Sequence, residues 1–317
     1  MTQITSVQIL SKSVQIRVPS NSPTPYTLNI KPYTTKMPKT ITIDVLRGML
    51  RPRPEEGHKG TFGHALLVAG CYGMAGAGIL AGRACMRSGV GKLTIHIPRS
   101  NNAIMQIALP EAILHHDTSE VCWTSMPLSA SGQIAYNAIG IGPGIGTGEE
   151  TADVLHQLLV ALKNSGLPMV VDADALNILA SYPKWFELLP KGTIITPHPL
   201  EYSRLKNAGV DMKNITLVLK GHHTTITLPN HPEPSYICQW GNSGMGTAGS
   251  GDVLTGIILG LLAQGYRPEE AALLGVGLHA LSGDLAASEL GQHSLVASDL
   301  IENLHKAFKR VTNEHKP

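Results

Sequence analysis

Asp252 has the strongest chemical context of any residue in this sequence. It lies where a run of small residues, 247–251, opens into an apolar segment with helical spacing, 254–262. A glycine-rich turn that begins a helix exposes backbone N–H groups and the positive end of the helix dipole, and it therefore binds anions. A lone carboxylate at a helix start is ordinarily a partner of that dipole. Beside a phosphate site, Asp252 is better interpreted as a base for a hydroxyl group next to a phosphoryl group.

The same stretch contains the spacing of a dinucleotide-binding fingerprint, in Gly244, Gly246 and Gly249. Such a fingerprint follows a strand, and an acidic residue ends the next strand. Here the acids that follow, Glu269 and Glu270, begin a helical pattern instead. We therefore reject a dinucleotide-cofactor site at this position.

Three other groups of residues follow predicted strands. A second glycine loop, 142–148, is either a tight turn or a backbone surface that faces a ligand, and its density of glycine favours the ligand surface. His198 stands between two prolines, which restrict the backbone and hold the side chain in place. Residues 220–224 read Lys-Gly-His-His-Thr at a strand end, which suits a loop against a nucleotide.

A protein-held metal is not predicted. His222 and His223 are adjacent, but no second group of ligands stands at a recognisable spacing. Asp172 and Asp174 flank a strand end, where they either reach magnesium through water or cap the following helix.

The elements that must position these residues alternate between strand and helix, which predicts an α/β fold with a mostly parallel sheet and helices on both faces. The strands are expected at 65–69, 93–97, 112–115, 138–141, 168–172, 192–196, 216–220, 225–228 and 236–238, and the helices at 43–50, 75–87, 151–165, 173–180, 200–208, 252–264, 268–281 and 298–310. We expect Asp44 at or near the cap of the first helix and Ser298 as the cap of the last. Residues 1–41 are interpreted as an N-terminal extension or linker, and residues 42–313 as one domain.

Composition narrows the class of protein. Hydrophobic residues make up 43% and charged residues 15% of the 317, which is typical of a well-buried enzyme. The net charge of +2 does not predict a nucleic-acid partner. No apolar run reaches the length of a membrane span, so no membrane partner is expected. Four scattered cysteines without a C-x-x-C pair favour reduced thiols and a cytoplasmic protein.

Six motifs occur in a fixed order along the chain: GTFGHALLVAG, GIGPGIG, VVDADALNIL, TPHPLE, LKG-x-x-T and GMGTAGSGDVLTG. Together they resemble the ADP/ATP-dependent NAD(P)H-hydrate dehydratases over residues 45–310. The resemblance implies a ribokinase-like three-layer sandwich. It also implies a reaction in which the 6-hydrate of NADH or NADPH is phosphorylated on its added hydroxyl and then loses phosphate. ADP is the expected phosphoryl donor, with ATP as the other candidate and Mg²⁺ bridging the phosphates.

The resemblance also assigns residues. Asp252 becomes the base, and an anion hole forms from the backbone amides of Ala248, Gly249, Ser250 and Gly251. The hydrate is expected to contact Ala77, Gly144, Gly146, His198 and Asp252. The nucleotide is expected to contact Lys220, Gly221, His222, His223, Thr224 and Gly251. We expect a homo-oligomer, with a tetramer as one candidate.

The sequence departs from the family pattern in two ways. Only residues 202–217 and Val218 separate TPHPLE from LKG, so one helix must make the crossover and one wall of the nucleotide site is expected to differ. The first 40 residues are too few for the epimerase domain of many relatives, so no epimerase activity is expected. Two other functions remain open: a small-molecule (vitamin or sugar) kinase of the same superfamily, and an inactive nucleotide-binding regulator. The intact GSGD argues against the regulator.

Overall fold

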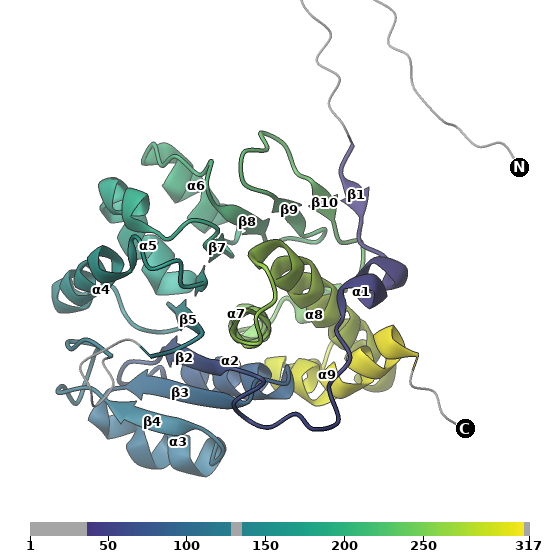
Figure 1. The fold of residues 1–317 in the computed structure, drawn as a ribbon, viewed down its shortest axis with the longest axis horizontal. Helices are drawn as coiled ribbons and strands as arrows, with labels where there is room; N and C mark the ends of the chain where they lie inside the picture. The colour runs from purple at the N-terminus through teal and green to yellow at the C-terminus, as the bar shows by residue number, and fades with distance from the viewer. Residues whose placement is uncertain (1–36, 128–134, 314–317) are drawn as a thin grey trace, which may run out of the picture. The chain divides into compact units, whose positions relative to one another are not determined.

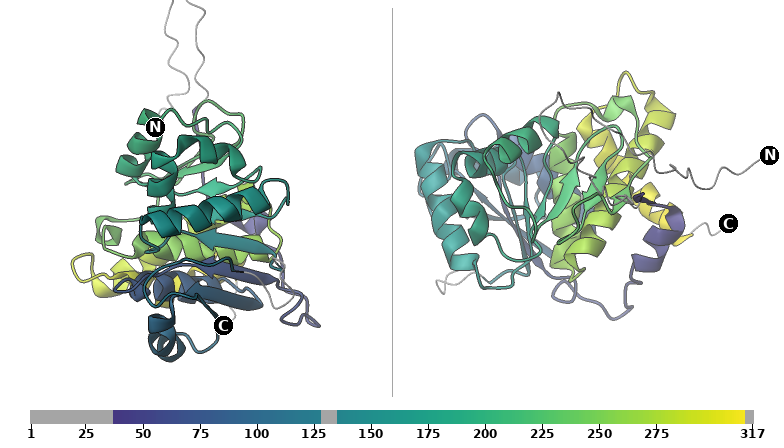
Figure 2. Two further views of the ribbon diagram at one scale, coloured as in Figure 1. Left: turned by 90° about the vertical axis from the view of Figure 1, so that its left-hand side faces the viewer. Right: turned by 90° about the horizontal axis from the view of Figure 1, so that it is seen from above.

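The computed structural model describes residues 37–127 and 135–313. Most of the predicted N-terminal extension lies outside these residues, so the predicted boundary at residue 41 stays a prediction. Three layers are evident: helices, a central sheet, and helices again (Figure 1; Figure 2, right). This is the α/β sandwich that the alternation of strands and helices predicts.

Among the described residues, the sheet has ten strands in the order β1-β10-β9-β8-β7-β6-β5-β2-β3-β4. The strands are β1 (Lys39–Thr40), β2 (His64–Val68), β3 (Lys92–Ile97), β4 (Ile113–His116), β5 (Ala138–Ile141), β6 (Met169–Val171), β7 (Ile194–Ile195), β8 (Thr216–Leu219), β9 (Thr225–Thr227) and β10 (Tyr236–Ile237). The seven strands from β8 to β4 are mutually parallel, whereas β9 is antiparallel to both of its neighbours. A mostly parallel sheet is thus confirmed, and its loops at the carboxyl edge meet in one region.

The helices divide between two hydrophobic cores, one on each face of the sheet. One face carries α1 (Ile43–Met49), α2 (Ala75–Arg87), α3 (Asn102–Ala108), α7 (Ser250–Ala263), α8 (Pro268–Leu290) and α9 (Ala297–Thr312). The other face carries α4 (Glu149–Leu162), α5 (Ala173–Ser181), the 3₁₀ helix η2 (Pro183–Leu188) and α6 (Pro199–Asn207). The crossover between β7 and β8 uses the single short helix α6, as predicted.

The structure corrects several predictions at element ends. Thr42, and not Asp44, caps α1, because its side chain accepts a hydrogen bond from the Val45 amide. The cap of α9 is Val296, and not Ser298, with Asp299 accepting a hydrogen bond from the Val296 amide. The short elements β1 and α3 have no counterpart in the sequence prediction.

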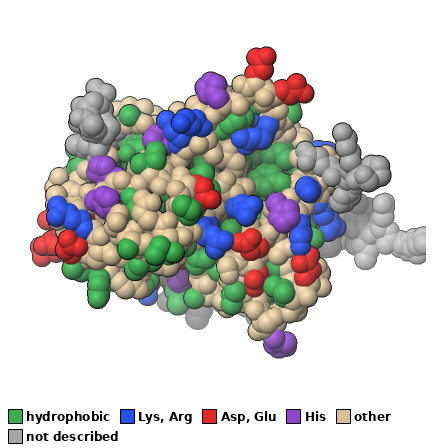
Figure 3. Space-filling view, turned by 90° about the horizontal axis from the view of Figure 1, so that it is seen from below, with side chains coloured by type: hydrophobic (Ala, Val, Ile, Leu, Met, Phe, Trp, Pro, Cys, Tyr) green, Lys and Arg blue, Asp and Glu red, His purple; other side chains and the backbone are tan. Residues whose placement is uncertain are grey.

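Helix α8 extends nine residues past its predicted end at residue 281. Its length and hydropathy would allow it to cross a membrane, contrary to the sequence prediction, but 72% of its most apolar window is buried inside the protein. It packs between α7 and α9, as a core helix does. On the face shown in Figure 3, basic and acidic side chains are interspersed, without a continuous basic surface.

Candidate active site

The predicted site residues converge because their strands are neighbours. The segments that follow β5, β6, β7 and β8 carry the 142–148 loop, Asp172, His198 and Lys220 respectively. Parallel strands bring these segments to one edge of the sheet, where α/β folds bind their ligands. The first turn of α7 reaches the same edge, because Lys220 lies beside Gly251.

The N-terminus of α7 depends on Gly249. This residue is the N-cap and has a φ of 87°, in the left-handed region. A Cβ atom at Gly249 would lie 2.3 Å from Leu80 Cδ1 and 3.1 Å from Ala297 Cβ, so only glycine fits. The helix that follows is buried from Val253 to Ala263, which places its positive end at the predicted anion hole. The Ser250 amide makes a long hydrogen bond of 3.4 Å to the Thr247 carbonyl.

Asp252 lies in the first turn of α7 and is partly buried. The pKa of its carboxyl is raised to about 7, mainly by burial and also by the nearby Asp172 and Asp174 carboxylates, against the opposite effect of Lys220. A base works best when its pKa lies near the operating pH. The predicted base therefore has the electrostatics that proton transfer at neutral pH requires.

A buried ion pair stands next to Asp252. The Lys220 Nζ donates to Asp172 Oδ1 at 2.8 Å, and Thr255 Oγ1 donates to Asp172 Oδ2 at 2.7 Å. A Cβ atom at Gly251 would lie 3.1 Å from the Lys220 Nζ. Asp172 is the N-cap residue of α5, as the sequence suggested, but its carboxylate makes no cap hydrogen bond and binds Lys220 and Thr255 of α7 instead.

Three of the residues predicted to contact the hydrate lie together. A Cβ atom at Gly144, whose φ is 61°, would lie 3.1 Å from Ala77 Cβ, so the loop approaches α2 closely. Two residues on, the Gly146 amide donates to Asp174 Oδ2 at 2.9 Å. The Asp174 carboxylate also raises the pKa of Asp252, so this glycine loop lies near the predicted base.

His198 has a structural role that sequence reasoning missed. It is the N-cap of α6, and its Nδ1 accepts hydrogen bonds from the Leu200 and Glu201 amides at 3.1 and 3.4 Å. Its Nε2 lies 3.5 Å from Glu201 Oε1, and the side chain is 44% exposed. The Lys220 amide donates to the Pro197 carbonyl, which places His198 beside the Lys220 strand end. Its predicted contact with the hydrate stays a prediction.

The remaining nucleotide-loop residues lie on the surface. His222 and His223 are exposed, with ring centroids 4.3 Å apart, and Thr224 Oγ1 donates to the Gly221 carbonyl at 3.4 Å. Within residues 37–127 and 135–313, His, Cys, Asp and Glu side chains form no group of three that could hold a metal ion.

His279 of α8 was not predicted. Its Nε2 lies 2.9 Å from the Ser250 carbonyl oxygen and 3.3 Å from Ser250 Oγ. Burial lowers the pKa of His279 to about 4, so the ring is neutral and Nε2–H donates to the carbonyl. This nitrogen cannot then act as a base for Ser250, and His279 instead anchors the first turn of α7. No motif in the sequence marked it, because it stands alone within an apolar helix.

The fold and this site define a member of the ribokinase-like superfamily. A ribokinase-like protein from Enterococcus faecalis superimposes with a TM-score of 0.72 at 26% identity, covering 86% of this chain and 96% of that one. The family model described as NAD(P)H-hydrate dehydratase matches residues 65–306. The chain therefore belongs to the NAD(P)H-hydrate dehydratase family.

Individual relatives agree with this family. The chain is 34% identical to an ADP-dependent (S)-NAD(P)H-hydrate dehydratase of Bacillus subtilis, over 85% of this chain and 97% of the relative. A structure of the ADP/ATP-dependent enzyme from B. subtilis, co-crystallised with ATP/Mg²⁺, has a TM-score of 0.72 at 31% identity, covering 86% of this chain and 98% of that one. A bifunctional NAD(P)H-hydrate repair enzyme of Moorella thermoacetica is 35% identical over 87% of this chain, which spans only 55% of that relative.

Proposed function

We propose that this chain converts the 6-hydrates of NADH and NADPH back to the reduced dinucleotides, with ADP or ATP as the phosphoryl donor. One observation carries the proposal: a carboxyl group with a pKa raised to about 7 stands in the first turn of a helix that opens from a glycine turn. That arrangement suits proton removal from a hydroxyl beside a phosphoryl group. The family membership supplies the hydroxyl, on the hydrated nicotinamide ring.

The reaction uses few protein groups. Asp252 takes the proton from the hydroxyl on C6 of the hydrate as its oxygen bonds to the terminal phosphorus of the donor. The bond from that phosphorus to the bridging oxygen breaks, so ADP becomes AMP. Backbone amides at residues 248–251 stabilise the charge on the moving group. The lone pair of the ring nitrogen then expels phosphate from C6, and loss of a proton from C5 restores the double bond.

Lys220 is assigned to the donor phosphates. Its ammonium is fixed by Asp172 beside Gly251, where phosphate oxygens would approach the α7 amides. A fixed cation costs little reorganisation during phosphoryl transfer, which makes it more effective than a mobile one. The exposed loop 221–224 is then left for the remainder of the nucleotide.

Magnesium fits this site as an ion carried by the nucleotide. Both oxygens of Asp172 are already hydrogen-bonded, so that carboxylate cannot be the main ligand. Phosphate and water oxygens would supply most ligands, with Asp174 as the protein carboxylate offered to the ion. When bound, the ion neutralises phosphate charge.

The direct test incubates the protein with NADH hydrate and either ADP or ATP, and follows the near-ultraviolet absorbance of regenerated NADH. Asp252→Asn should lower kcat by about 10²–10⁴-fold, because the base is lost. ADP binding should survive, since removing a negative charge cannot weaken phosphate binding. Asp44→Asn, at an 88% exposed side chain, is the matched control. Stable phosphorylated product without NADH would favour a small-molecule kinase instead.

We also propose a cytoplasmic homo-oligomer, as a tetramer. All four cysteines are free thiols, which suits a reducing compartment. Self-association is supported by exposed apolar side chains on α3 and the edge strand β4, namely Ile104, Ile107 and Ile113. Light scattering coupled to size-exclusion chromatography would test the state, and a monomer at working concentration would overturn it.

A further inference from the structure

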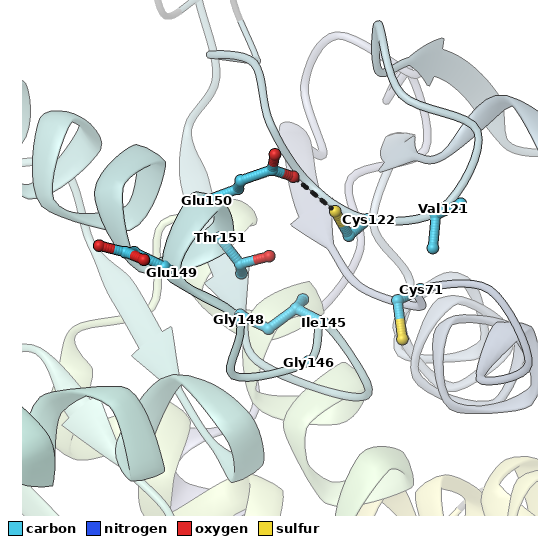
Figure 4. Close-up of a pocket in the computed structure, with 9 residues that line it drawn as sticks. All are labelled: Cys71, Val121, Cys122, Ile145, Gly146, Gly148, Glu149, Glu150 and Thr151. Atoms are coloured by element: carbon cyan, nitrogen blue, oxygen red, sulfur yellow. Dashed lines mark hydrogen bonds between the residues drawn. The ribbon is translucent and has the colours of Figure 1, made fainter.

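A cavity of about 300 Å³ lies next to the glycine loop that follows β5 (Figure 4). The loops after β2, β4 and β5 and the first turn of α4 line it, and they contribute Cys71, Val121, Cys122, Gly146, Glu150 and Thr151. Its volume is at the lower end of small-molecule sites, which suits one ring system and not a whole dinucleotide.

The cavity shares Gly146 with the candidate hydrate site. Gly146 lines the cavity, and its amide donates to Asp174 at the reaction centre. The Cys71 amide donates to the carbonyl of Gly144, a residue assigned to the hydrate. Burial is the main cause of the raised pKa of both Cys71 and Asp252, and the Asp174 carboxylate adds to it in both. Asp174 therefore lies near both the cavity and the base.

The order of the strands shows on which side of the reaction centre the cavity lies. Lys220, on the donor side, follows β8, and Asp174 follows β6 by way of the first residues of α5. The cavity follows β5 and β2, so it lies on the side of the reaction centre away from the donor. In a transfer between two ligands that meet end to end, this side holds the part of the acceptor that is remote from its reacting ring.

The residues that line the cavity indicate which part of the acceptor it could bind. The walls are mainly apolar side chains, thiols and glycine backbone, which suit a flat heterocycle. The Glu150 carboxylate and the Thr151 hydroxyl extend toward the cavity, whereas Glu149 points away (Figure 4). Glu150 accepts a weak hydrogen bond from the Cys122 thiol at 3.5 Å, and a stronger donor would replace it. A carboxylate repels phosphate, so the cavity suits a base with an exocyclic amino group.

We propose that this cavity binds the adenine base of the hydrated dinucleotide, with its amino group donating to Glu150. The inference rests on the proposed function, since it takes the hydrated dinucleotide as substrate. It makes Val121 and Glu150 specificity-determining residues for the end of the substrate that does not react.

The test compares two substrates that share the reacting ring. One is NADH hydrate, and the other is the hydrate of reduced nicotinamide mononucleotide, which lacks the adenylate half. Val121→Trp fills the cavity mouth from a side chain that is 55% exposed, so the fold should tolerate it. The matched control is Val160→Trp, at a 54% exposed valine near the far end of α4.

We expect Val121→Trp to raise the KM for NADH hydrate by about tenfold or more while the KM for the mononucleotide hydrate changes less than twofold. Glu150→Gln should act in the same direction more weakly, and Val160→Trp should change neither value. An equal rise for both substrates, or none for either, would overturn the assignment of adenine to this cavity. If the wild-type chain converts neither hydrate, the proposed function fails. Calorimetric titration of Val121→Trp and Val160→Trp with NADH then tests the cavity separately. An unaltered affinity for NADH in Val121→Trp would overturn the assignment of adenine to the cavity.

Discussion

The Lys220 ammonium and the Asp172 carboxylate lie 2.8 Å apart, and Asp172 is 1% exposed. Lys220 follows β8, Asp172 follows β6, and Thr255 of α7 hydrogen-bonds to the second oxygen of Asp172. One buried carboxylate therefore joins two strand ends to the helix that carries Asp252. The positive charge of Lys220 is held beside Gly251 before any phosphate arrives.

Asp172→Asn should break this arrangement. Removing one partner of a buried ion pair typically costs about 3–5 kcal/mol, and the 21% exposure of Lys220 places the expected loss near the lower end. Because Lys220 would no longer be held beside Gly251, the variant should also have a KM for ADP that rises more than its KM for hydrate. Urea unfolding and steady-state kinetics measure the two effects. The control is Asp211→Asn, whose partner Lys213 is 78% exposed and whose loss should cost less than about 1 kcal/mol.

The raised pKa of Asp252 predicts a pH-dependent stability. An unfolded Asp loses its proton near pH 4, whereas burial and Asp172 keep Asp252 protonated in the folded protein up to about pH 7. Between these values the unfolded state binds fewer protons, so stability falls as pH rises, and the full penalty is present above pH 7. The upper bound is about 4 kcal/mol at 1.36 kcal/mol per unit.

Asp252→Asn removes that penalty, because the amide does not ionise. Its melting temperature should exceed that of the wild type by several degrees at pH 8, and by much less near pH 4.5. An equal difference at the two pH values would show that packing, and not the charge, causes the change. A lower melting temperature at pH 8 would contradict the raised pKa.

Gly251 is predicted to be the closest approach of backbone to phosphate. Its backbone is helical, so substitution requires no left-handed conformation, and the reason for glycine is space. A Cβ atom would lie 3.1 Å from the Lys220 Nζ and 3.7 Å from Asp172 Oδ2. Gly251→Val should therefore displace Lys220 and abolish measurable ADP binding in calorimetry while the fold persists. The control Gly48→Val, with nothing within 4 Å of its Cβ position, should bind ADP normally.

The sequence was sufficient to predict the parallel sheet and most strands, because buried strands such as 138–141 read as short apolar runs that lead into a glycine-rich loop. It also placed Asp252 at a helix start and grouped the glycine loop, His198 and Lys220 at one edge, since parallel strands require it. These predictions depend on local residue patterns and on the order of strands and helices, and both can be inferred from the sequence alone.

Contacts between distant segments were not predictable. The Asp172–Thr255 hydrogen bond joins residues 83 positions apart, and the His279–Ser250 contact joins residues 29 apart on two apolar helices. The cap of α9 was also misplaced: Ser298 is a typical cap residue by type, but the cap is Val296, whose amide donates to the Asp299 side chain. In each case the side-chain geometry, and not the residue type, decides the role.

The last prediction separates the two ligands. Among the residues assigned to hydrate and nucleotide, His198 stands at the end of β7 and Thr224 follows β8, on either side of the Lys220 strand end. Replacing His198 with alanine would also remove the cap of α6, at a cost of about 1 kcal/mol, so the informative variant is His198→Asn, which can still cap the helix. We expect His198→Asn to raise the KM for hydrate more than that for ADP, and Thr224→Ala to raise the KM for ADP more than that for hydrate. Comparison of His198→Asn with His198→Ala isolates the effect of the cap, because only the alanine variant should lose stability.

Equal effects of His198→Asn and Thr224→Ala on both ligands would mean one shared site. Turnover of an oxidisable substrate by hydride transfer, without ADP or ATP, would overturn the interpretation of the dinucleotide as the molecule that is repaired.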